Sequence, residues 1–294
     1  MFDTNPHLIQ EAPRAAPWMK PAPLVLIHDG GGTTFSYHCL GNLDRTVYGI
    51  SNPHYKSGET KWEDGLHGMA RHYLKLIKTV IPRGKLILGG WSLGGLVSLE
   101  IARLLADDPA MNLVGIVMVD SIYPLVRRIQ DATVPIVQHA MEWSDRTRQE
   151  TRDTVLRCFS EAQGMVSTWT PPTWGDDETQ SHLQSLTTAT NTLSPSKTQG
   201  PPPPPVILLR AEQAVPIQQE KGVSRVDVSR DDRLLGWGEY RQGLITEVVD
   251  LPNCHHFNLF ISDEALDIAT EKIRKACLDL EALASGAGAG AGRK

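Results

Sequence analysis

The chain has 294 residues, of which 40% are hydrophobic and 21% charged, and its formal net charge is −5. Charges of both signs are interspersed, which argues against nucleic acid or a membrane surface as the main partner. A chain of this length fits one α/β domain that carries an insertion.

The cysteines and the N-terminal composition suggest a cellular compartment. The four cysteines are scattered, with no Cys-x-x-Cys pair, as is typical of reduced thiols. The N-terminal region is polar and rich in proline, and it lacks the apolar segment of a secretory signal. No apolar run approaches the roughly 20 residues that cross a bilayer. We therefore expect a cytoplasmic protein without a membrane-spanning segment.

The first part of the chain predicts alternating strands and helices. Residues 1–22 form an extended lead-in with several prolines. The continuous apolar run 24–27 is typical of a buried parallel strand, and the glycine-rich loop 28–32 follows it. A second strand is expected at 46–50. Apolar residues at three- and four-residue spacing then predict an amphipathic helix over 66–80.

A serine motif follows the next strand, which is expected at 85–88. Gly90-Trp91-Ser92-Leu93-Gly94 fits the Gly-x-Ser-x-Gly pattern of a nucleophile elbow, and a helix-forming stretch comes after it. A serine at such a strand-to-helix turn has a strained backbone, and glycines on either side let strand and helix pass closely. The turn brings the hydroxyl to the positive end of a helix, where a developing oxyanion is stabilised.

The second part of the chain interrupts this pattern and then resumes it. The apolar run 113–119 predicts a strand that ends at Asp120, and 206–209 predicts another that is followed by Glu212. Between them, helical and polar segments precede five consecutive prolines at 201–205, which form a stiff polyproline II spacer. An insertion of this size would suit a helical lid over an active site.

The C-terminal part predicts a short helix at 230–242, a last strand at 244–249 and a long final helix from Ser262. Its last ten residues, 285–294, have the composition of a flexible tail. The expected organisation has four parts: a lead-in at 1–22, a core at 23–120 and 206–284, a lid insertion at 121–205 and a tail at 285–294.

Serine chemistry needs a base and an orienting acid, because a hydroxyl is a weak nucleophile at neutral pH. In the α/β-hydrolase order, serine precedes the acid and the acid precedes histidine. His255 and His256 both follow the last predicted strand, so either can supply the base. Asp120 and Glu212 both follow a strand, so either can supply the acid. The residues alone leave both choices open.

Two stretches carry a resemblance to a known family. Residues 65–73 followed by 88–95, with Met69-Ala70 and Gly89-Gly90-Trp91-Ser92, closely resemble the thioesterase domains of polyketide and nonribosomal peptide synthases. Leu235-Gly236-Trp237 and, after the last strand, His256-Phe257 resemble the C-terminal signature of that family. The chain differs from the family at His28-Asp29-Gly30 and at Cys254-His255. The likeness covers most of 24–283 outside the lid.

The resemblance implies an α/β-hydrolase fold with a mostly parallel central sheet, flanking helices and a helical lid insertion. It implies Ser92 as nucleophile, Asp120 as acid and His256 as base. The oxyanion donors expected are the N–H of Leu93 and one from Gly30 or Gly31.

The resemblance also implies the reaction. An acyl chain would leave the phosphopantetheine thiol of an acyl or peptidyl carrier protein through an acyl-serine, by hydrolysis or cyclisation. The domain itself would need no cofactor or metal. It is compatible with a stand-alone enzyme and with the C-terminal domain of a larger synthase.

Two other functions stay open at this stage. One is a free-standing carboxylesterase that acts on small oxygen esters, and the missing secretory signal and the Gly-Gly-Trp-Ser elbow argue against it. The other is a non-catalytic binding module of α/β-hydrolase fold, against which the intact Ser92, Asp120 and His256 argue.

Overall fold

A mostly parallel sheet forms the centre of the protein. The computed structural model describes residues 4–14, 20–58, 62–124, 134–137, 143, 145–175, 201–217 and 222–290. Within these residues the sheet has seven strands in the order β1-β3-β2-β4-β5-β7-β9. Their bounds are β1 His7–Gln10, β2 Leu24–Ile27, β3 Val47–Ile50, β4 Gly84–Trp91, β5 Met111–Val119, β7 Val206–Ala211 and β9 Ile245–Leu251.

Every neighbouring pair in this sheet is parallel except β1 with β3. Parallel strands need crossover connections, and the intervening helices cover both faces of the sheet. The described helices are α1 Gly65–Val80, α2 Leu93–Leu105, α4 Gln149–Ser167, α6 Trp237–Tyr240 and α7 Asp263–Gly290, with short 3-10 helices η2 Phe35–Cys39 and η4 Arg225–Asp227. The predicted α/β class with flanking helices is confirmed.

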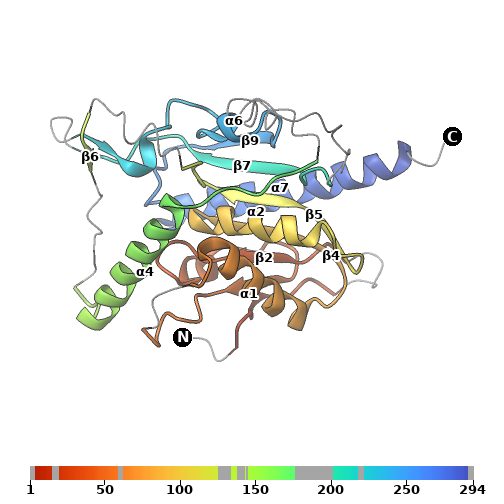
Figure 1. Ribbon diagram of the computed structural model, residues 1–294, viewed down its shortest axis with the longest axis horizontal. Helices are drawn as coiled ribbons and strands as arrows, with labels where there is room; N and C mark the ends of the chain where they lie inside the picture. The colour runs from red at the N-terminus through yellow and green to blue at the C-terminus, as the bar shows by residue number, and fades with distance from the viewer. Residues whose placement is uncertain are drawn as a thin grey trace, which may run out of the picture.

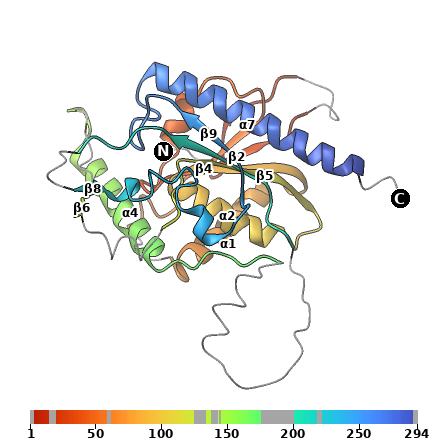
Figure 2. The same cartoon turned by 90° about the horizontal axis from the view of Figure 1, so that it is seen from above.

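The hydrophobic core has two layers, one on each face of the sheet. Figure 2 shows α7 on one side of the strands and α1 and α2 on the other. Alternate residues of a strand point to opposite faces. In β2, Val25 and Ile27 accordingly pack with the α1 and α2 side, whereas Leu24 and Leu26 pack with the α7 side.

The interior strands are apolar on both faces because each face packs against one of the two core layers. All four residues of β2 are buried, and so are the first four of β7. The carboxyl ends of β4, β5 and β9 lie at one edge of the sheet (Figure 1), and the residues that follow these strands approach one another there.

Two elements differ from the sequence predictions at the chain ends. The lead-in contains β1, which pairs antiparallel with β3 at the edge of the sheet. At the other end, α7 continues to Gly290 and so includes the first residues of the predicted tail. Alanine is the best helix former, and extending an existing helix needs no new nucleation.

The predicted lid insertion, 121–205, lies between β5 and β7. Its described part holds α4 and the short strand β6, Ile136–Val137. β6 pairs in parallel with β8, Val223–Ser224, which follows β7. This small second sheet lies beside α4 (Figure 2) and joins the insertion to the loop between β7 and β9.

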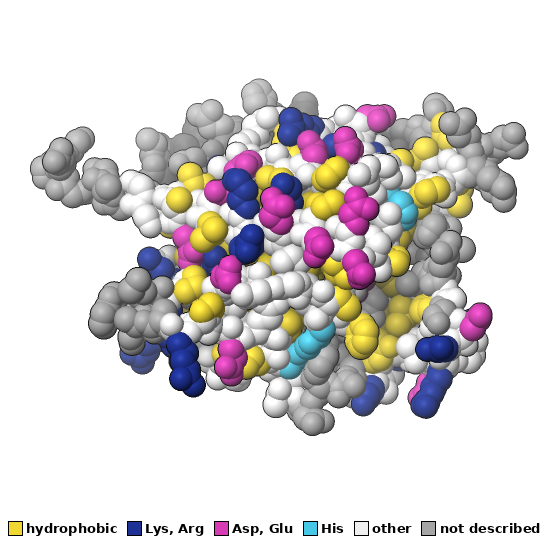
Figure 3. Space-filling view, turned by 180° about the vertical axis from the view of Figure 1, so that it is seen from behind, with side chains coloured by type: hydrophobic (Ala, Val, Ile, Leu, Met, Phe, Trp, Pro, Cys, Tyr) yellow, Lys and Arg dark blue, Asp and Glu magenta, His cyan; other side chains and the backbone are white. Residues whose placement is uncertain are grey.

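The surface carries charges of both signs. Figure 3 shows acidic and basic side chains intermixed over one face, with hydrophobic side chains gathered toward its lower right. None of the four cysteines, all in the described part of the chain, forms a disulfide. No described helix has both the length and the hydropathy needed to cross a bilayer.

Candidate active site

Ser92 occupies the turn between β4 and α2. Its backbone has φ 55° and ψ −115°, an uncommon conformation for a residue with a side chain. A Cβ at Gly94 would lie 2.3 Å from the carbonyl oxygen of Ile27, and one at Gly90 would lie 2.7 Å from the same oxygen. Only glycine therefore lets α2 cross the end of β2 this closely, which is the packing that the motif predicts.

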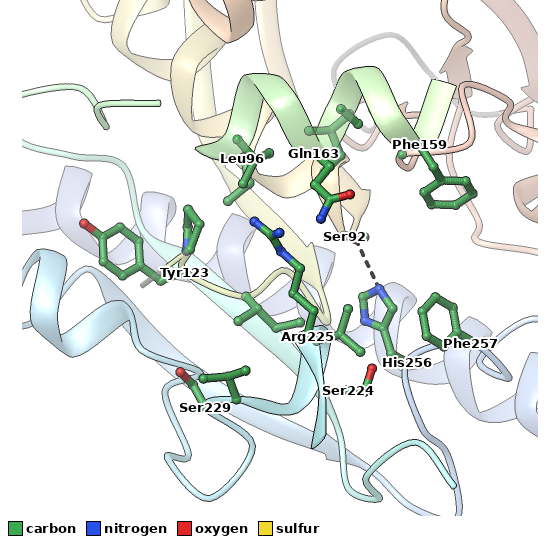
Figure 4. Close-up of a pocket in the computed structure, with 18 of the residues that line it drawn as sticks. Ser92, Leu96, Tyr123, Phe159, Gln163, Ser224, Arg225, Ser229, His256 and Phe257 are labelled. Carbon is green, nitrogen blue, oxygen red and sulfur yellow. Dashed lines mark hydrogen bonds between the residues drawn. The ribbon is translucent and has the colours of Figure 1, made fainter. Parts of the chain in front are cut away.

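The serine hydroxyl, an imidazole and a carboxylate form a continuous hydrogen-bonded chain. His256 Nε2 lies 3.1 Å from Ser92 Oγ, the contact that the dashed line in Figure 4 marks. His256 Nδ1 lies 2.8 Å from Asp120 Oδ2. Asp120 is fully buried and His256 is 2% exposed, so the pair is shielded from water. The structure thus brings together the three residues predicted as nucleophile, base and acid.

The Asp120 carboxylate has four hydrogen-bond donors. Oδ1 accepts from the backbone N–H of Ala211 at 2.9 Å and from Arg230 Nη1 at 2.6 Å. Oδ2 accepts from Arg230 Nη2 at 2.9 Å and from the His256 ring. Burial alone would raise the pKa of Asp120, but the bonds from His256 and Arg230 outweigh burial and lower this pKa to about 2. The carboxylate is therefore ionised at neutral pH.

An ionised Asp120 fixes the tautomer of the histidine. A carboxylate can only accept, so Nδ1 of His256 carries the proton and Nε2 is left with a lone pair directed at Ser92. That arrangement can remove a proton from the serine hydroxyl.

Arg230 was not predicted from the sequence. It lies in a polar run, Ser229-Arg230-Asp231-Asp232, which resembles an exposed loop, yet its side chain is only 6% exposed. It is 110 residues from Asp120 along the chain. Spacing and periodicity give no signal for such a contact, which depends on how the β7–β9 connection folds back over β5.

The alternative acid and base lie apart from this chain of contacts. Glu212 follows β7 as predicted, but its side chain is exposed. His255 is half-buried, and its Nδ1 accepts from the backbone N–H of Phe257 at 3.3 Å. His256 and Asp120, the residues that the family resemblance favours, are the ones that bond Ser92 directly and through the histidine, respectively.

Two of the three predicted oxyanion donors lie at the cavity. Leu93 and Gly30 both line the space in front of Ser92. Leu93 is the first residue of α2, so its N–H has no intrahelical partner. The N–H of Gly31 instead donates to Asp29 Oδ1 at 3.1 Å. The geometry therefore favours Gly30 over Gly31 as the second donor.

Two titratable side chains support the Gly30 loop from behind. Burial lowers the pKa of His28 to about 4, so its ring is neutral. Its Nδ1 bonds the carbonyl oxygen of Asp29 and its Nε2 lies 2.6 Å from the Tyr73 hydroxyl. Because Nδ1 must donate to a carbonyl, Nε2 accepts from Tyr73. Burial raises the pKa of the Asp29 carboxyl to about 7.

Ser92 opens into a cavity of about 530 Å³. One wall comes from α4 and another from the segment 224–229, which includes η4. Figure 4 shows Phe159 and Gln163 of α4 across the cavity from Arg225 and Ser224. Most of the lining is apolar, so the cavity is suited to a hydrocarbon-rich ligand. Within the described residues no group of three or more His, Cys, Asp or Glu side chains is placed to hold a metal ion.

Comparison with known proteins identifies the family of this chain. Residues 22–141 match the family model described as "Thioesterase domain". The probable thioesterase gloN of Glarea lozoyensis is 36% identical over 283 residues, which cover 94% of this chain and 98% of that protein. The nonribosomal peptide synthetase imqB of Aspergillus flavus is 32% identical over 285 residues, or 94% of this chain and 8% of that one.

The fold also matches solved structures. The NocB thioesterase domain, in a covalent complex with a fluorophosphonate nocardicin G analog, superposes with a TM-score of 0.58 at 21% sequence identity. The match covers 88% of this chain and 96% of that chain. The architecture is therefore that of an α/β-hydrolase. The chain belongs to the thioesterase family, and it is an enzyme of that class.

Proposed function

We propose that this thioesterase releases an acyl chain from the phosphopantetheine thiol of an acyl or peptidyl carrier protein through an acyl-serine intermediate. The hydrogen-bonded chain Ser92–His256–Asp120 at the mouth of an apolar cavity is the observation that carries the proposal. The similarity of the protein to a nonribosomal peptide synthetase, over 94% of the protein's length, supports a carrier-bound substrate.

In the acylation step, His256 Nε2 takes the proton of Ser92 as Oγ bonds to the thioester carbon. The N–H groups of Leu93 and Gly30 stabilise the oxyanion, and a well-placed donor of this kind contributes about 3–4 kcal/mol to transition-state stabilisation. The imidazolium formed is stabilised by Asp120. It returns the proton to the sulfur as the C–S bond breaks, which leaves a free thiol and an acyl-serine.

In the second step, water or a hydroxyl or amine of the acyl chain attacks the acyl-serine. His256 removes its proton and later returns a proton to Ser92 Oγ. Water yields a free acid, whereas an internal nucleophile yields a ring. The cavity walls decide between them, because they determine which nucleophile reaches the carbonyl carbon.

The test is turnover of acyl-N-acetylcysteamine thioesters, with products identified by mass. Ser92→Ala and His256→Ala should each lower kcat by about 10⁴-fold or more. The neighbouring His255→Ala is the matched control and should retain activity. Asp120→Asn and Glu212→Gln form a second matched pair, of which only the first should lose activity.

Each alternative function gives a distinct result. Faster turnover of oxygen esters than of matched thioesters would favour a carboxylesterase. If the wild type is inert on all esters and Ser92 does not react with a fluorophosphonate, the binding-module interpretation replaces catalysis. A dead His255→Ala beside an active His256→Ala would overturn the assignment of the base.

A further inference from the structure

One cationic side chain faces the apolar cavity. Arg225 belongs to η4 and lines the same space as Ser92, together with apolar residues such as Leu96, Ile122 and Val166. Figure 4 shows its side chain extending toward Gln163 of α4. The two side chains come from the two segments that form the walls of the cavity, and they bring polar groups to an otherwise apolar region.

Neither side chain has a partner among the residues that the structure describes. Arg225 and Gln163 form no hydrogen bond or ion pair with any described residue through their side chains. Arg225 is half-buried, and its burial lowers the pKa of the guanidinium. A partly desolvated cation without a counterion is unfavourable unless a ligand supplies one.

The nearest acid on the same 3-10 helix is already occupied. Asp227 accepts from Arg230 Nε through Oδ1 at 2.9 Å and from the backbone N–H of Val215 through Oδ2 at 2.7 Å. Arg230 in turn directs its remaining donors to Asp120 and to two carbonyl oxygens. The contrast within six residues is clear: Arg230 is saturated by the protein, whereas Arg225 is directed at the cavity.

The polar character of this wall extends beyond the arginine. Ser224 and Ser229 are both 3% exposed and both line the cavity. A guanidinium binds a carboxylate through two parallel N–H donors, and an amide such as that of Gln163 can add a third. Hydroxyl groups alongside can donate to the same oxygens.

We propose that Arg225, with Gln163 on the opposite wall, forms a subsite for a carboxylate carried by the acyl chain at a distance from its thioester. This inference rests on the proposed function, because the acyl chain must occupy the cavity in front of Ser92. The substrate class is then an apolar acyl chain with a second, anionic end. The phosphate of phosphopantetheine shares this oxyanion chemistry, and the experiment separates the two sources.

The experiment compares two N-acetylcysteamine thioesters of equal length, octanoyl and the half-thioester of octanedioic acid. The wild type should have the higher kcat/KM for the carboxylate-ended substrate. Arg225→Met should lower that value by about 10- to 100-fold, the range expected for hydrogen bonds to a charged group, and leave the octanoyl value nearly unchanged. Arg225→Lys should recover part of the lost kcat/KM, because lysine keeps the positive charge but lacks the paired N–H donors of the guanidinium.

Two further variants define the subsite. Gln163→Leu should cause a smaller loss than Arg225→Met, again only for the carboxylate-ended substrate. Arg233→Met is the matched control, since the Arg233 side chain is 67% exposed and bonds Asp250 instead of facing the cavity. Arg233→Met should change kcat/KM for neither substrate.

Several outcomes would overturn the subsite. If the wild type hydrolyses both thioesters alike and Arg225→Met changes neither, the subsite is absent while thioesterase activity stands. The same two acyl chains are also tested as thioesters of phosphopantetheine. If Arg225→Met lowers kcat/KM only for the phosphopantetheine thioesters, and equally for the octanoyl and the carboxylate-ended chain, Arg225 binds the phosphate instead.

A binding measurement keeps the test independent of turnover. Calorimetry on Ser92→Ala, which cannot turn the substrates over, should detect the half-thioester of octanedioic acid more readily than the octanoyl thioester, and the preference should disappear in the double variant with Arg225→Met. If the wild type is inert on every thioester, this result still decides whether the subsite exists. Equal binding of the two thioesters would refute it.

Discussion

Arg230 is placed to orient the histidine through the acid. Its five N–H donors meet five acceptors: both oxygens of Asp120, one oxygen of Asp227 and the carbonyl oxygens of Ala211 and Val226. A planar guanidinium with every donor occupied has a single orientation. Arg230 therefore fixes the orientation of the Asp120 carboxylate and, through it, that of the His256 imidazole. We regard Arg230 as a positioning residue.

Replacing Arg230 with methionine removes these hydrogen bonds and the positive charge while keeping a side chain of similar length. We expect kcat to fall by up to about 100-fold with KM little changed, because a misplaced imidazole affects the transition state more than binding. The free energy of unfolding should fall by about 3–5 kcal/mol, since Asp120 becomes a buried charge without its counterion. Steady-state kinetics and urea denaturation measure the two effects.

A pH profile separates positioning from general destabilisation. Loss of Arg230 raises the pKa of Asp120 from its value of about 2, so the variant should lose activity at a higher pH than the wild type during acidification. Arg230→Lys, which keeps the charge, should shift this limb less. An unchanged profile in both variants would mean that Arg230 only stabilises the fold.

At the level of elements, partly buried hydrogen bonds attach the segment after α4 to the core. Trp169 Nε1 donates to Glu100 Oε1 of α2 at 2.5 Å, and His67 of α1 bonds the other carboxylate oxygen at 2.8 Å. Trp174 Nε1 donates to the Tyr240 hydroxyl at 2.9 Å. These contacts hold one wall of the cavity against the sheet domain.

Trp169→Phe should weaken this anchor. The change removes one donor from a buried carboxylate, so we expect the free energy of unfolding to fall by about 1–3 kcal/mol. KM for long acyl thioesters should rise, because α4 forms the cavity wall. Trp62→Phe is the matched control, since its indole nitrogen has no hydrogen-bond partner in the described structure. Equal effects of the two variants would show that ring volume, not the hydrogen bond, stabilises the segment.

The elements predicted best are those whose apolar pattern matches their burial. A helix was expected at 66–80, and α1 spans Gly65–Val80 with its buried residues on one stripe. The helix expected at 230–242 is shorter, because Asp232 accepts from the backbone N–H of Leu234 and Gly236. Leu235 and Gly236 then adopt positive φ, and only Trp237–Tyr240 is helical.

β1 escaped prediction for a different reason. It has four residues, His7–Gln10, with polar side chains at both ends, and it follows Pro6. Its stability comes from pairing with β3 and not from its own pattern. An edge strand of this kind gives too weak a periodic signal for assignment from sequence.

For the site, the sequence predicts which loops meet but not how they bond. Ser92, Asp120 and the histidines each follow a predicted strand, and parallel strands bring such ends together. The choice of His256 over His255 needed the family resemblance. Arg225 and Arg230 lie in an irregular connection whose path depends on tertiary packing, so neither could be assigned in advance.

For the whole molecule, two neighbouring side chains make opposite contributions to stability as pH changes. The pKa of His28 is lowered from 6.5 to about 4, so its contribution is present above pH 6.5 and is lost as pH falls toward 4. The pKa of Asp29 is raised from 3.8 to about 7, so its contribution is lost as pH rises through 7 and regained on acidification. Between pH 4 and 6.5 the two effects oppose each other.

Single substitutions should therefore tilt the pH dependence in opposite directions. Relative to the wild type, Asp29→Asn should lose stability more steeply between pH 6.5 and 4.5, and His28→Gln less steeply. Each group contributes a slope of about 1.4 kcal/mol per pH unit in this window. Urea denaturation at a series of pH values measures the slopes. Parallel curves for wild type and both variants would contradict these titrations.

The order of the strands also affects how activity develops during folding. Residues 92, 120 and 256 meet only when β4, β5, β7 and β9 have paired, and these strands are drawn from segments between residues 84 and 251. Pairing of distant segments is slow, because loop closure must precede the contacts that reward it. Hydrolytic activity should consequently return with the last refolding phase, later than helical circular dichroism, and an enzyme assay would report the moment at which the sheet is complete.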